Sequence, residues 1–155
     1  MAAQTVTIRP SRARLTAILV ALGGLSVILA LLAAAVPPGR ASLRVALGLA
    51  ALLAAGATIA FWRGRNAALT IGADGIRDEG GRMIAPLDQV AGVDRGVFAM
   101  KPASGFVVRL TVAPGSRWVP GLWWRAGRLL GVGGLAPLAA TRAAADLLTA
   151  LIRSR

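Results

Sequence analysis

The chain has 155 residues, is 56% hydrophobic and only 15% charged, and carries a formal net charge of +12. Soluble domains average about 25% charged and about 45–50% apolar residues, so this composition excludes an ordinary soluble domain of this size. Cysteine and histidine are both absent, which excludes disulfides, thiolate or imidazole metal sites, and serine–histidine or cysteine–histidine catalysis.

Two long apolar runs occupy the first part of the chain. Residues 15–36 are uncharged and would span roughly 33 Å as a helix, enough for the hydrocarbon core of a bilayer. The paired prolines of "PPGR" (37–40) cannot continue this helix. A second apolar run follows at once and predicts a helix over about 43–62. The sequence therefore predicts a membrane protein with a transmembrane hairpin in an N-terminal segment, residues 1–65.

A cleaved signal peptide is the alternative interpretation of the first apolar run. The run has a basic flank, "RPSRAR", and a small-residue segment, "AAAVPP", that would suit a cleavage site. However, the apolar region of a signal peptide usually has about 7–15 residues, and this run is longer. Its length favours a retained helix.

Arginines flank the apolar runs unequally. Five lie beside the outer ends of the two helices, whereas the connecting turn holds two, Arg40 and Arg44. Because cytoplasmic flanks are enriched in Lys and Arg, we expect both termini in the cytoplasm. The arginine- and alanine-rich composition is typical of a GC-rich bacterial genome, so we predict a multi-pass protein of a bacterial inner (plasma) membrane. The predicted interface anchors are Arg12, Arg14, Trp62, Arg63 and Arg65.

Small residues recur every four positions in both apolar runs. They are Ser26, Ala30 and Ala34 in the first, and Ala46, Ala50 and Ala54 in the second. Such stripes let helices approach closely in lipid, and we interpret them as packing within the hairpin. Neither run contains Asp, Glu, Lys or His, so an ion path is not indicated.

Residues 66–155 have the pattern of a β-domain. The stretch "LTIGADGIRDEGGRMIAP" predicts short strands joined by turns at "GADG" and "EGG". Strand patterns continue through "VAGVDRGVFAM", with a bulge expected at Gly96, and through the regularly alternating "FVVRLTVA". The closing "TRAAADLLTALIRSR" predicts an amphipathic helix over about 141–154, with Thr141 as its N-cap. The order favours a mainly-β barrel, open or partly closed, that is capped by a C-terminal α-helix.

Three features carry a resemblance to a known family. They are "LTIGADGIRDEGGRMIAPLDQVAGV", the arginine-flanked "WWRAGRLLGVGGLAPLAAT" and the closing amphipathic helix. In these the chain resembles small bacterial membrane proteins with two N-terminal transmembrane helices and a pleckstrin-homology-like (bacterial PH) domain. The resemblance implies a seven-stranded, sandwich-like barrel plugged at one end by its C-terminal helix. Phosphoinositide-binding relatives carry basic residues around the first hairpin, whereas this hairpin holds Asp74, Asp78 and Glu79 beside Arg77 and Arg82. Inositide binding is therefore not implied.

The segment "GLWWRAGRLLG" (121–131) is the candidate contact surface. On a helical wheel, its leucines and Trp123 fall on one side, Arg125 and Arg128 lie opposite, and Trp124 is at the border. That is the pattern of a short interfacial helix. The interpretation that we favour, however, is that the segment connects two strands and packs its leucines and Trp123 on the barrel, with membrane contact as the second interpretation. The predicted membrane-surface or partner contacts are Trp123, Trp124, Arg125 and Arg128.

The remaining residues point away from catalysis and from nucleic acid. Residues 66–155 hold eleven basic against six acidic side chains, and the other seven basic residues flank the apolar runs. Nucleic-acid binding is therefore not expected. Asp88 and Asp94, the candidate carboxylate pair, suit turn capping and surface charge. No catalytic residue, cofactor or metal site is predicted, and we expect a protein that is not an enzyme.

Together these patterns predict a membrane-anchored, non-enzymatic module that is integral to the lipid bilayer. It would bind a protein partner or the membrane surface through its β-domain. The alternative is a structural or assembly subunit that acts through its transmembrane hairpin. The oligomeric state is not predicted.

Overall fold

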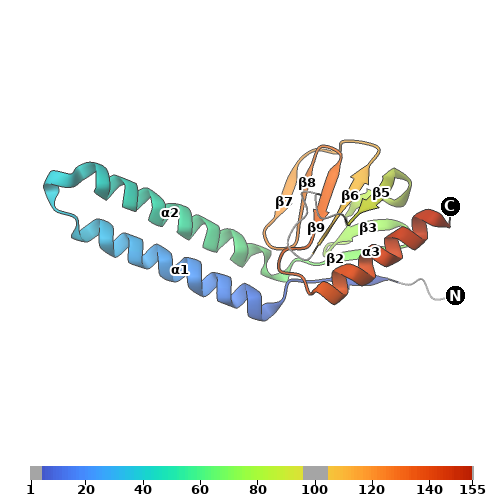
Figure 1. Ribbon diagram of the computed structural model, residues 1–155, viewed down its shortest axis with the longest axis horizontal. Helices are drawn as coiled ribbons and strands as arrows, with labels where there is room; N and C mark the ends of the chain where they lie inside the picture. Colours follow the sequence, from blue (N-terminus) through green and yellow to red (C-terminus); the bar gives the residue numbers. More distant parts are fainter. Residues whose placement is uncertain (1–4, 96–104, 155) are drawn as a thin grey trace. The chain divides into compact units, whose positions relative to one another are not determined.

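The structure, a computed structural model, describes residues 5–95 and 105–154. The chain divides into two compact units, the helical hairpin Arg12–Arg65 and a β-domain made of residues 1–11 and 66–155 (Figure 1). Two long apolar helices are thus followed by two antiparallel sheets and a C-terminal helix, as the sequence predicts at this level. The bulge predicted at Gly96 lies outside the described residues.

The hairpin consists of α1 (Arg12–Ala35) and α2 (Ala41–Arg63), joined by the 3-10 turn η1 (Pro38–Arg40). Helices of 24 and 23 residues are about 36 and 34 Å long at a 1.5 Å rise per residue. Both are therefore long and apolar enough to cross a membrane. Pro37 is extended, with φ −60° and ψ 151°, and this ends the first helix near the predicted position.

Small side chains and two hydrogen bonds hold the hairpin together. Ala33, Ala51 and Ala54 are buried, and the Ser26 hydroxyl donates to the carbonyl of Ala51 at 3.0 Å. At the turn, the Arg44 guanidinium donates to the Val36 carbonyl at 2.6 Å. This carbonyl follows the last turn of α1, where backbone acceptors lack helical partners. Arg44 therefore stabilises the turn of the hairpin.

The predicted stripes of small residues coincide with this interface only in part. Ser26 and Ala54 lie at the contact between the helices, but Ala30, Ala34 and Ala46 are not buried there. Residues spaced four apart advance by more than one turn of a helix with 3.6 residues per turn. A stripe of that period therefore winds around the helix and departs from a straight line of contact. The small residues on the contact line include Ala33 and Ala51, which the stripes omit.

The first sheet of the β-domain has the order β1-β2-β3-β4. Its strands are β1 (Val6–Ile8), β2 (Leu69–Gly72), β3 (Gly75–Asp78) and β4 (Met83–Pro86). β1 precedes α1 in the chain but pairs antiparallel with β2, which follows α2 after the 3-10 turn η2 (Gly64–Asn66). The hairpin is therefore an insertion between two neighbouring strands. The sequence pattern groups residues 1–65 together, whereas residues 1–11 belong with the β-domain.

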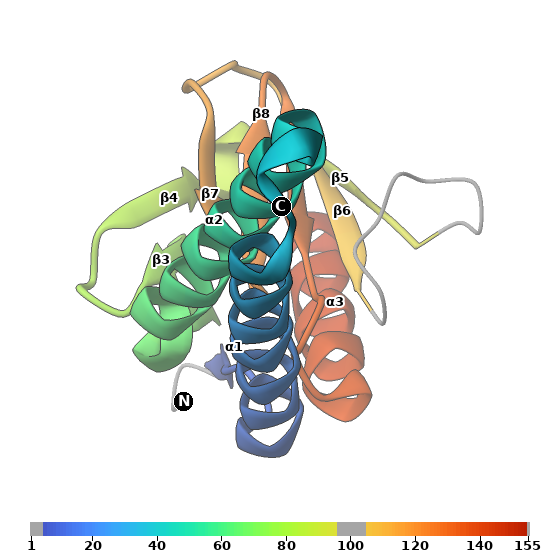
Figure 2. The same ribbon diagram turned by 90° about the vertical axis from the view of Figure 1, so that its left-hand side faces the viewer.

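The second sheet has the order β5-β6-β9-β8-β7, also antiparallel. Its strands are β5 (Val90–Asp94), β6 (Phe106–Leu110), β7 (Arg117–Val119), β8 (Trp123–Ala126) and β9 (Leu129–Val132). The 3-10 turn η3 (Leu87–Gln89) carries the chain from β4 into β5. Figure 2 shows β3 and β4 on one side of the domain and β5 and β6 on the other.

The C-terminal helix α3 (Leu138–Arg153) contacts β1, β2 and β5. It begins three residues before the predicted N-cap, and Thr141 instead lies inside its first turns. The Thr141 hydroxyl donates to the Leu138 carbonyl at 3.0 Å, and the residue is only 2% exposed. Pro137 precedes the helix in an extended conformation, and Leu138 is exposed. The cap prediction at Thr141 is wrong because back-bonding within a helix and N-capping use the same residue type.

One core joins both sheets and α3. It includes Ile8, Leu69 and Ile71 from the first sheet, Phe106, Val108, Leu130 and Val132 from the second, and Ala144 and Leu148 from the helix. The described strands pair as two sheets with no ladder between them, so they do not form a closed barrel. The described strands number nine, against the seven that the resemblance implies. The two sheets are held together by side chains that pack across the core. The alternation of a strand shows that one of its faces is buried, but it does not show whether that strand pairs with a strand of the other sheet.

Replacing Ile8 tests the contribution of β1 to the β-domain. Ile8 is fully buried in the core, so Ile8→Ala should lower the free energy of unfolding by about 2–5 kcal/mol. Thr7→Ala, at the exposed neighbour in the same strand, should change it by less than about 1 kcal/mol. Urea unfolding of the full chain in detergent, followed by tryptophan fluorescence, measures both. Equal midpoints for wild type and Ile8→Ala would contradict the pairing.

Candidate functional site

The segment 121–131 forms a β-hairpin, not the interfacial helix that its helical wheel suggests. β8 and β9 pair with Trp123 opposite Val132 and Trp124 opposite Gly131. Gly127, between them, has φ +56°, which a tight turn requires and an L side chain adopts only at a cost. Because side chains alternate along a strand, Trp123 and Arg125 face one side of the sheet while Trp124 and Ala126 face the other. The interfacial-helix interpretation is therefore wrong, whereas the favoured interpretation, that the segment packs Trp123 on the β-domain, is confirmed.

Trp123 lies in the core of the β-domain. It is 2% exposed and pairs across the sheet with Val119 and Val132. The Arg117 guanidinium lies over its ring, 5.8 Å from the ring centroid. The indole nitrogen has no hydrogen-bond partner among the described residues. The folded domain therefore does not present Trp123 to a lipid or protein surface.

Arg125 also faces inward, and its guanidinium binds the protein's own backbone. It donates to the carbonyls of Ile84 at 3.0 Å, Gly115 at 3.2 Å and Pro114 at 3.2 Å. Ile84 belongs to β4, so this side chain links the second sheet to the first and to the loop before β7. A guanidinium with five fixed donors suits such a site because it can satisfy several acceptors at once. Arg125 is a structural residue.

Trp124 is the outward-facing tryptophan of the predicted pair. It is half-buried, and its indole lies across its cross-strand partner Gly131, where an added Cβ would fall 2.3 Å from the Trp124 Cε2. On its other side Trp124 pairs with Trp118 of β7, whose side chain is 64% exposed. The two tryptophans thus stand side by side on the outer face of the sheet. Glycine at position 131 leaves the space that the ring occupies.

An apolar and basic surface surrounds these two rings. We call it the tryptophan face and define it by Trp118, Trp124, Ala126, Arg128 and Leu129. Leu129, opposite Ala126 in the ladder, is 38% exposed, and Arg128 is exposed in the β8–β9 turn. Within the described part of the chain, the Arg128 guanidinium has no ion pair or hydrogen bond.

The predicted interface anchors all lie at exposed positions at the open end of the hairpin. Arg12 and Arg14 are exposed in the first turn of α1, and Arg63 is exposed in the last turn of α2. Trp62 is 54% exposed. The Arg65 guanidinium lies 4.3 Å from the Trp62 ring centroid and donates to the Trp62 carbonyl at 3.2 Å. This end therefore carries a cation-aromatic cluster of the kind found at membrane interfaces.

The acidic residues of the first hairpin are used within the fold. The Asp78 carboxylate is buried and accepts from the backbone N–H groups of Gly80 and Arg82 at 3.1 and 2.9 Å. Arg117 lies 3.9 Å from the same carboxylate. Asp74 pairs with Arg77 at 3.4 Å. These carboxylates order two turns, and the described residues contain no group of acids able to hold a metal ion.

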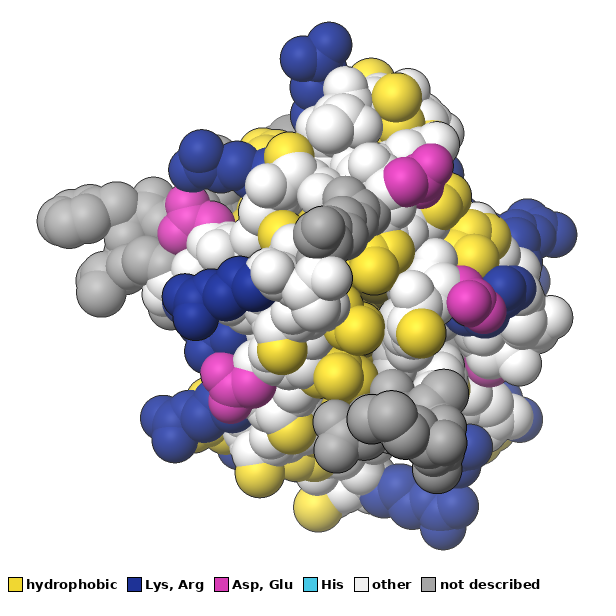
Figure 3. Space-filling view, turned by 90° about the vertical axis from the view of Figure 1, so that its right-hand side faces the viewer, with side chains coloured by type: hydrophobic (Ala, Val, Ile, Leu, Met, Phe, Trp, Pro, Cys, Tyr) yellow, Lys and Arg dark blue, Asp and Glu magenta, His cyan; other side chains and the backbone are white. Residues whose placement is uncertain are grey.

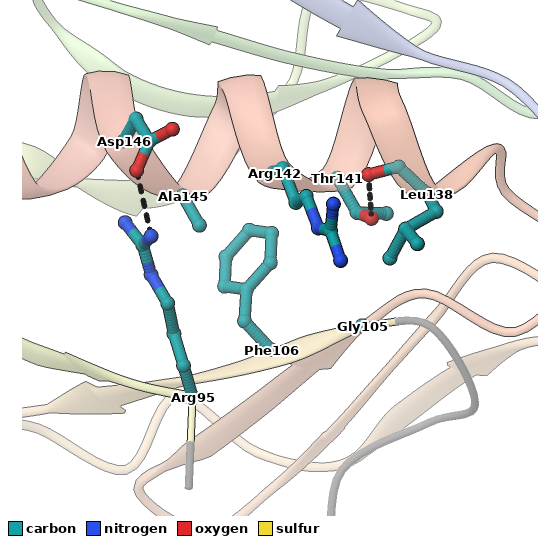
Figure 4. A pocket seen from close by; sticks show the side chains of 8 residues that line it. All are labelled: Arg95, Gly105, Phe106, Leu138, Thr141, Arg142, Ala145 and Asp146. Atoms are coloured by element: carbon teal, nitrogen blue, oxygen red, sulfur yellow. Dashed lines mark hydrogen bonds and ion pairs between the residues drawn. The ribbon is translucent and has the colours of Figure 1, made fainter.

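A hollow of about 340 Å³ lies between α3 and the ends of β5 and β6. Figure 4 shows Phe106 pointing from the sheet toward the helix, with Arg95 and Arg142 on either side. Arg95 donates to Asp146 at 2.6 Å and to the Thr149 hydroxyl at 3.2 Å, which ties β5 to α3. The Thr141 hydroxyl is occupied by its own helix. The described lining therefore brings together no nucleophile and base.

A second, shallower groove lies between β1 and α3. It is lined by Thr5, Val6, Ala143, Asp146, Leu147 and Ala150. Figure 3 shows the face seen from the right of Figure 1, where hydrophobic side chains gather in the middle and most arginines lie at the rim. Asp146, the charged residue of the groove, is paired with Arg95. The described lining of this groove is mostly apolar and offers no set of polar groups for chemistry.

Comparisons with family models, with curated proteins and with solved structures find no match to the chain. Function is therefore inferred from the residues and their positions alone.

Sequence reasoning misses Trp118 and β1. Trp118 stands in the short segment "RWV", which is too brief for a periodic pattern, and only the pairing of β7 with β8 brings it beside Trp124. β1 does leave a signal, because in "TVTI", before Pro10, all four residues are β-branched and polar threonines alternate with apolar residues. Because this segment directly precedes the arginines and the first apolar run, its sequence is interpreted as part of the basic flank of a membrane helix.

Arg125 and Arg128 provide a matched pair for a stability test. Arg125→Ala leaves three backbone carbonyls without their donor and should lower the free energy of unfolding by about 1.5–3 kcal/mol. Arg128→Ala, at an exposed turn position, should change it by no more than about 0.5 kcal/mol. Urea titrations of both variants in detergent measure these changes in the free energy of unfolding. Similar losses for the two would show that Arg125 is not structural.

Gly131→Ala tests the position of Trp124. The new methyl group would meet the indole at 2.3 Å, so the rigid ring must move outward, at a cost of about 1–3 kcal/mol in stability. We expect a red shift of tryptophan emission as the ring becomes more exposed to water. Gly92→Ala is the control, because nothing lies within 4 Å of its added Cβ. An unchanged emission spectrum in Gly131→Ala would show that the ring does not occupy this position.

Proposed function

We propose that this protein is a membrane-anchored, non-enzymatic module of a bacterial inner membrane. Its helical hairpin spans the bilayer, and its β-domain is held at the cytoplasmic surface. The observation that carries the proposal is the pairing of β1 with β2 on either side of the inserted hairpin. The β-domain then binds the membrane surface or a protein partner.

The inserted hairpin supports a single-sided arrangement. Ile8 pairs directly with Leu69, and strands in a sheet lie about 4.8 Å apart. The chain leaves the sheet at Ile8, passes through α1 and α2, and returns to the next strand. If the hairpin spans the bilayer, both of its outer ends must emerge on the side that carries the β-domain. One helix crossing without the other would break the sheet.

The arginine distribution supports the cytoplasmic side for that domain. The open end of the hairpin carries exposed Arg12, Arg14, Arg63 and Arg65. The closed end carries fewer, Arg40 and Arg44. Because positive charge favours the cytoplasmic side, this distribution supports a turn on the outside.

Two further observations support a retained hairpin and a PH-like domain. Cleavage after the first apolar run would remove β1, and with it the fully buried Ile8. A four-stranded meander, a second antiparallel sheet and a C-terminal helix packed on their core are the parts that a PH-like domain requires. The hollow beside α3 brings together no nucleophile and base among the described residues, which supports a binding role.

A cysteine pair tests this topology in a chain that has no cysteine of its own. Thr7 and Thr70 are directly paired, with their Oγ1 atoms 3.3 Å apart, so Thr7→Cys/Thr70→Cys should form a disulfide in isolated membranes. Thr7→Cys/Ala126→Cys, with its second substitution on the other sheet, should not. Electrophoretic mobility with and without reductant measures the bond. Equal mobility of the two double variants under oxidising conditions would contradict the pairing of β1 with β2.

Membrane insertion and sidedness are measured on the same membranes. The chain should resist alkaline carbonate extraction. An impermeant maleimide should label the Gly39→Cys variant, substituted in the turn, from outside intact cells, and the Ala126→Cys variant only after permeabilisation. Extraction by carbonate would contradict the membrane anchor, and labelling of the Ala126→Cys variant in intact cells would contradict the orientation.

A further inference from the structure

We propose that the tryptophan face is a docking surface for the anionic headgroup layer of the bilayer that holds the hairpin. This inference rests on the proposed function, because it requires the hairpin to be inserted. It replaces the contact residues that the sequence indicates. Of those, Trp123 and Arg125 face the interior, whereas Trp124 and Arg128 belong to the face and are joined by Trp118 and Leu129.

The aromatic side chains of the face suit a lipid headgroup layer. Trp118 is 64% exposed, although burying a tryptophan is strongly favourable. Its neighbour Trp124 is half-buried, and Leu129 is 38% exposed on the same side of the sheet. Tryptophan concentrates at membrane–water interfaces because its ring is apolar and its N–H is polar. Two adjacent indoles on a rigid sheet form a preorganised contact of this kind.

The charge of the face identifies the headgroups as anionic. Arg128 is exposed in the turn between β8 and β9 and has no partner among the described residues. On the same side of the sheet, at the opposite edge, Asp94 of β5 is already paired with Arg109 of β6 at 2.8 Å. The described part of the face therefore has net positive charge. Each arginine near an anionic leaflet contributes about 1 kcal/mol of attraction.

The two covalent connections to the hairpin favour a lipid over a soluble partner. β1 ends at Ile8 and α1 begins at Arg12, while α2 ends at Arg63 and β2 begins at Leu69. Connections this short keep the β-domain next to the bilayer at high effective concentration. A weak surface, with two indoles and one free arginine among the described residues, can therefore dock without high intrinsic affinity.

The test uses a fluorescent reporter on the face and lipids that carry a quencher. Ala126 is exposed and lies on the same side of β8 as Trp124, so a label at Ala126→Cys leaves both tryptophans in place. The full chain is reconstituted in nanodiscs containing headgroup-quencher lipid, either with zwitterionic lipid alone or with added phosphatidylglycerol. A second reporter is placed at Ala143→Cys, exposed on α3, which contacts β1, β2 and β5.

We expect quenching at position 126 in anionic discs, little in zwitterionic discs, and little at position 143. Raising the salt concentration to 1 M should weaken it, because the Debye length falls to about 3 Å. Arg128→Gln should lower the docked-to-undocked ratio about fivefold, the factor that corresponds to about 1 kcal/mol per arginine. Arg153→Gln removes the same charge at an exposed position of α3 and should leave the ratio unchanged. Trp118→Ser, at an exposed edge position, should reduce quenching with the fold intact by circular dichroism.

Several outcomes would overturn the inference. These are no quenching at position 126 in anionic discs, stronger quenching at 143, or equal effects of Arg128→Gln and Arg153→Gln. A label at 126 that stays accessible in anionic discs but is shielded in native membranes would assign the face to a protein partner. In each case, carbonate resistance of the same chain shows that the hairpin is still inserted. The proposed function and the docking surface can therefore fail separately.

Discussion

The pairing of β1 with β2 is the constraint on which the rest of this structure depends. Two segments separated by more than fifty residues meet in register, with Ile8 opposite Leu69 and both side chains fully buried. This contact makes the helical hairpin an insertion in a sheet. It completes the core beneath α3, and it means that the β-domain cannot finish folding until the hairpin has brought its two ends together. Folding of the β-domain is therefore coupled to formation of the hairpin.

In the second sheet, chemically similar residues have different roles because neighbouring side chains of a strand face opposite sides of the sheet. Trp123 and Arg125 face inward and serve the core, where Arg125 supplies three backbone carbonyls with a donor. Trp124 and the arginine of the following turn remain at the surface. A difference of one position along the strand therefore separates a residue that holds the fold together from one that is available for contact.

Charge in the β-domain is distributed in the same way. Asp74, Asp78, Asp94 and Asp146 each lie within ion-pair distance of an arginine. Those pairs close turns or connect elements of the domain. Glu79 and Asp88 are exposed and have no ion pair among the described residues, and Arg128 on the tryptophan face has none either. The two hollows beside α3 bring together no nucleophile and base among their described lining residues.

The sequence by itself determined the two apolar helices, the change to β-structure near Asn66, the C-terminal helix and the absence of histidine and cysteine chemistry. These follow from local length, periodicity and composition, which each segment carries alone. Only the tertiary structure decided that residues 6–8 form a strand of the distant sheet, that the strands pair as two separate sheets, and which tryptophans are exposed. The eleven residues 121–131 satisfy a helical wheel and a hairpin equally well. Pairing with β6 and β7 on either side selects the hairpin, because backbone hydrogen bonds to neighbouring strands outweigh a short segment's own preference.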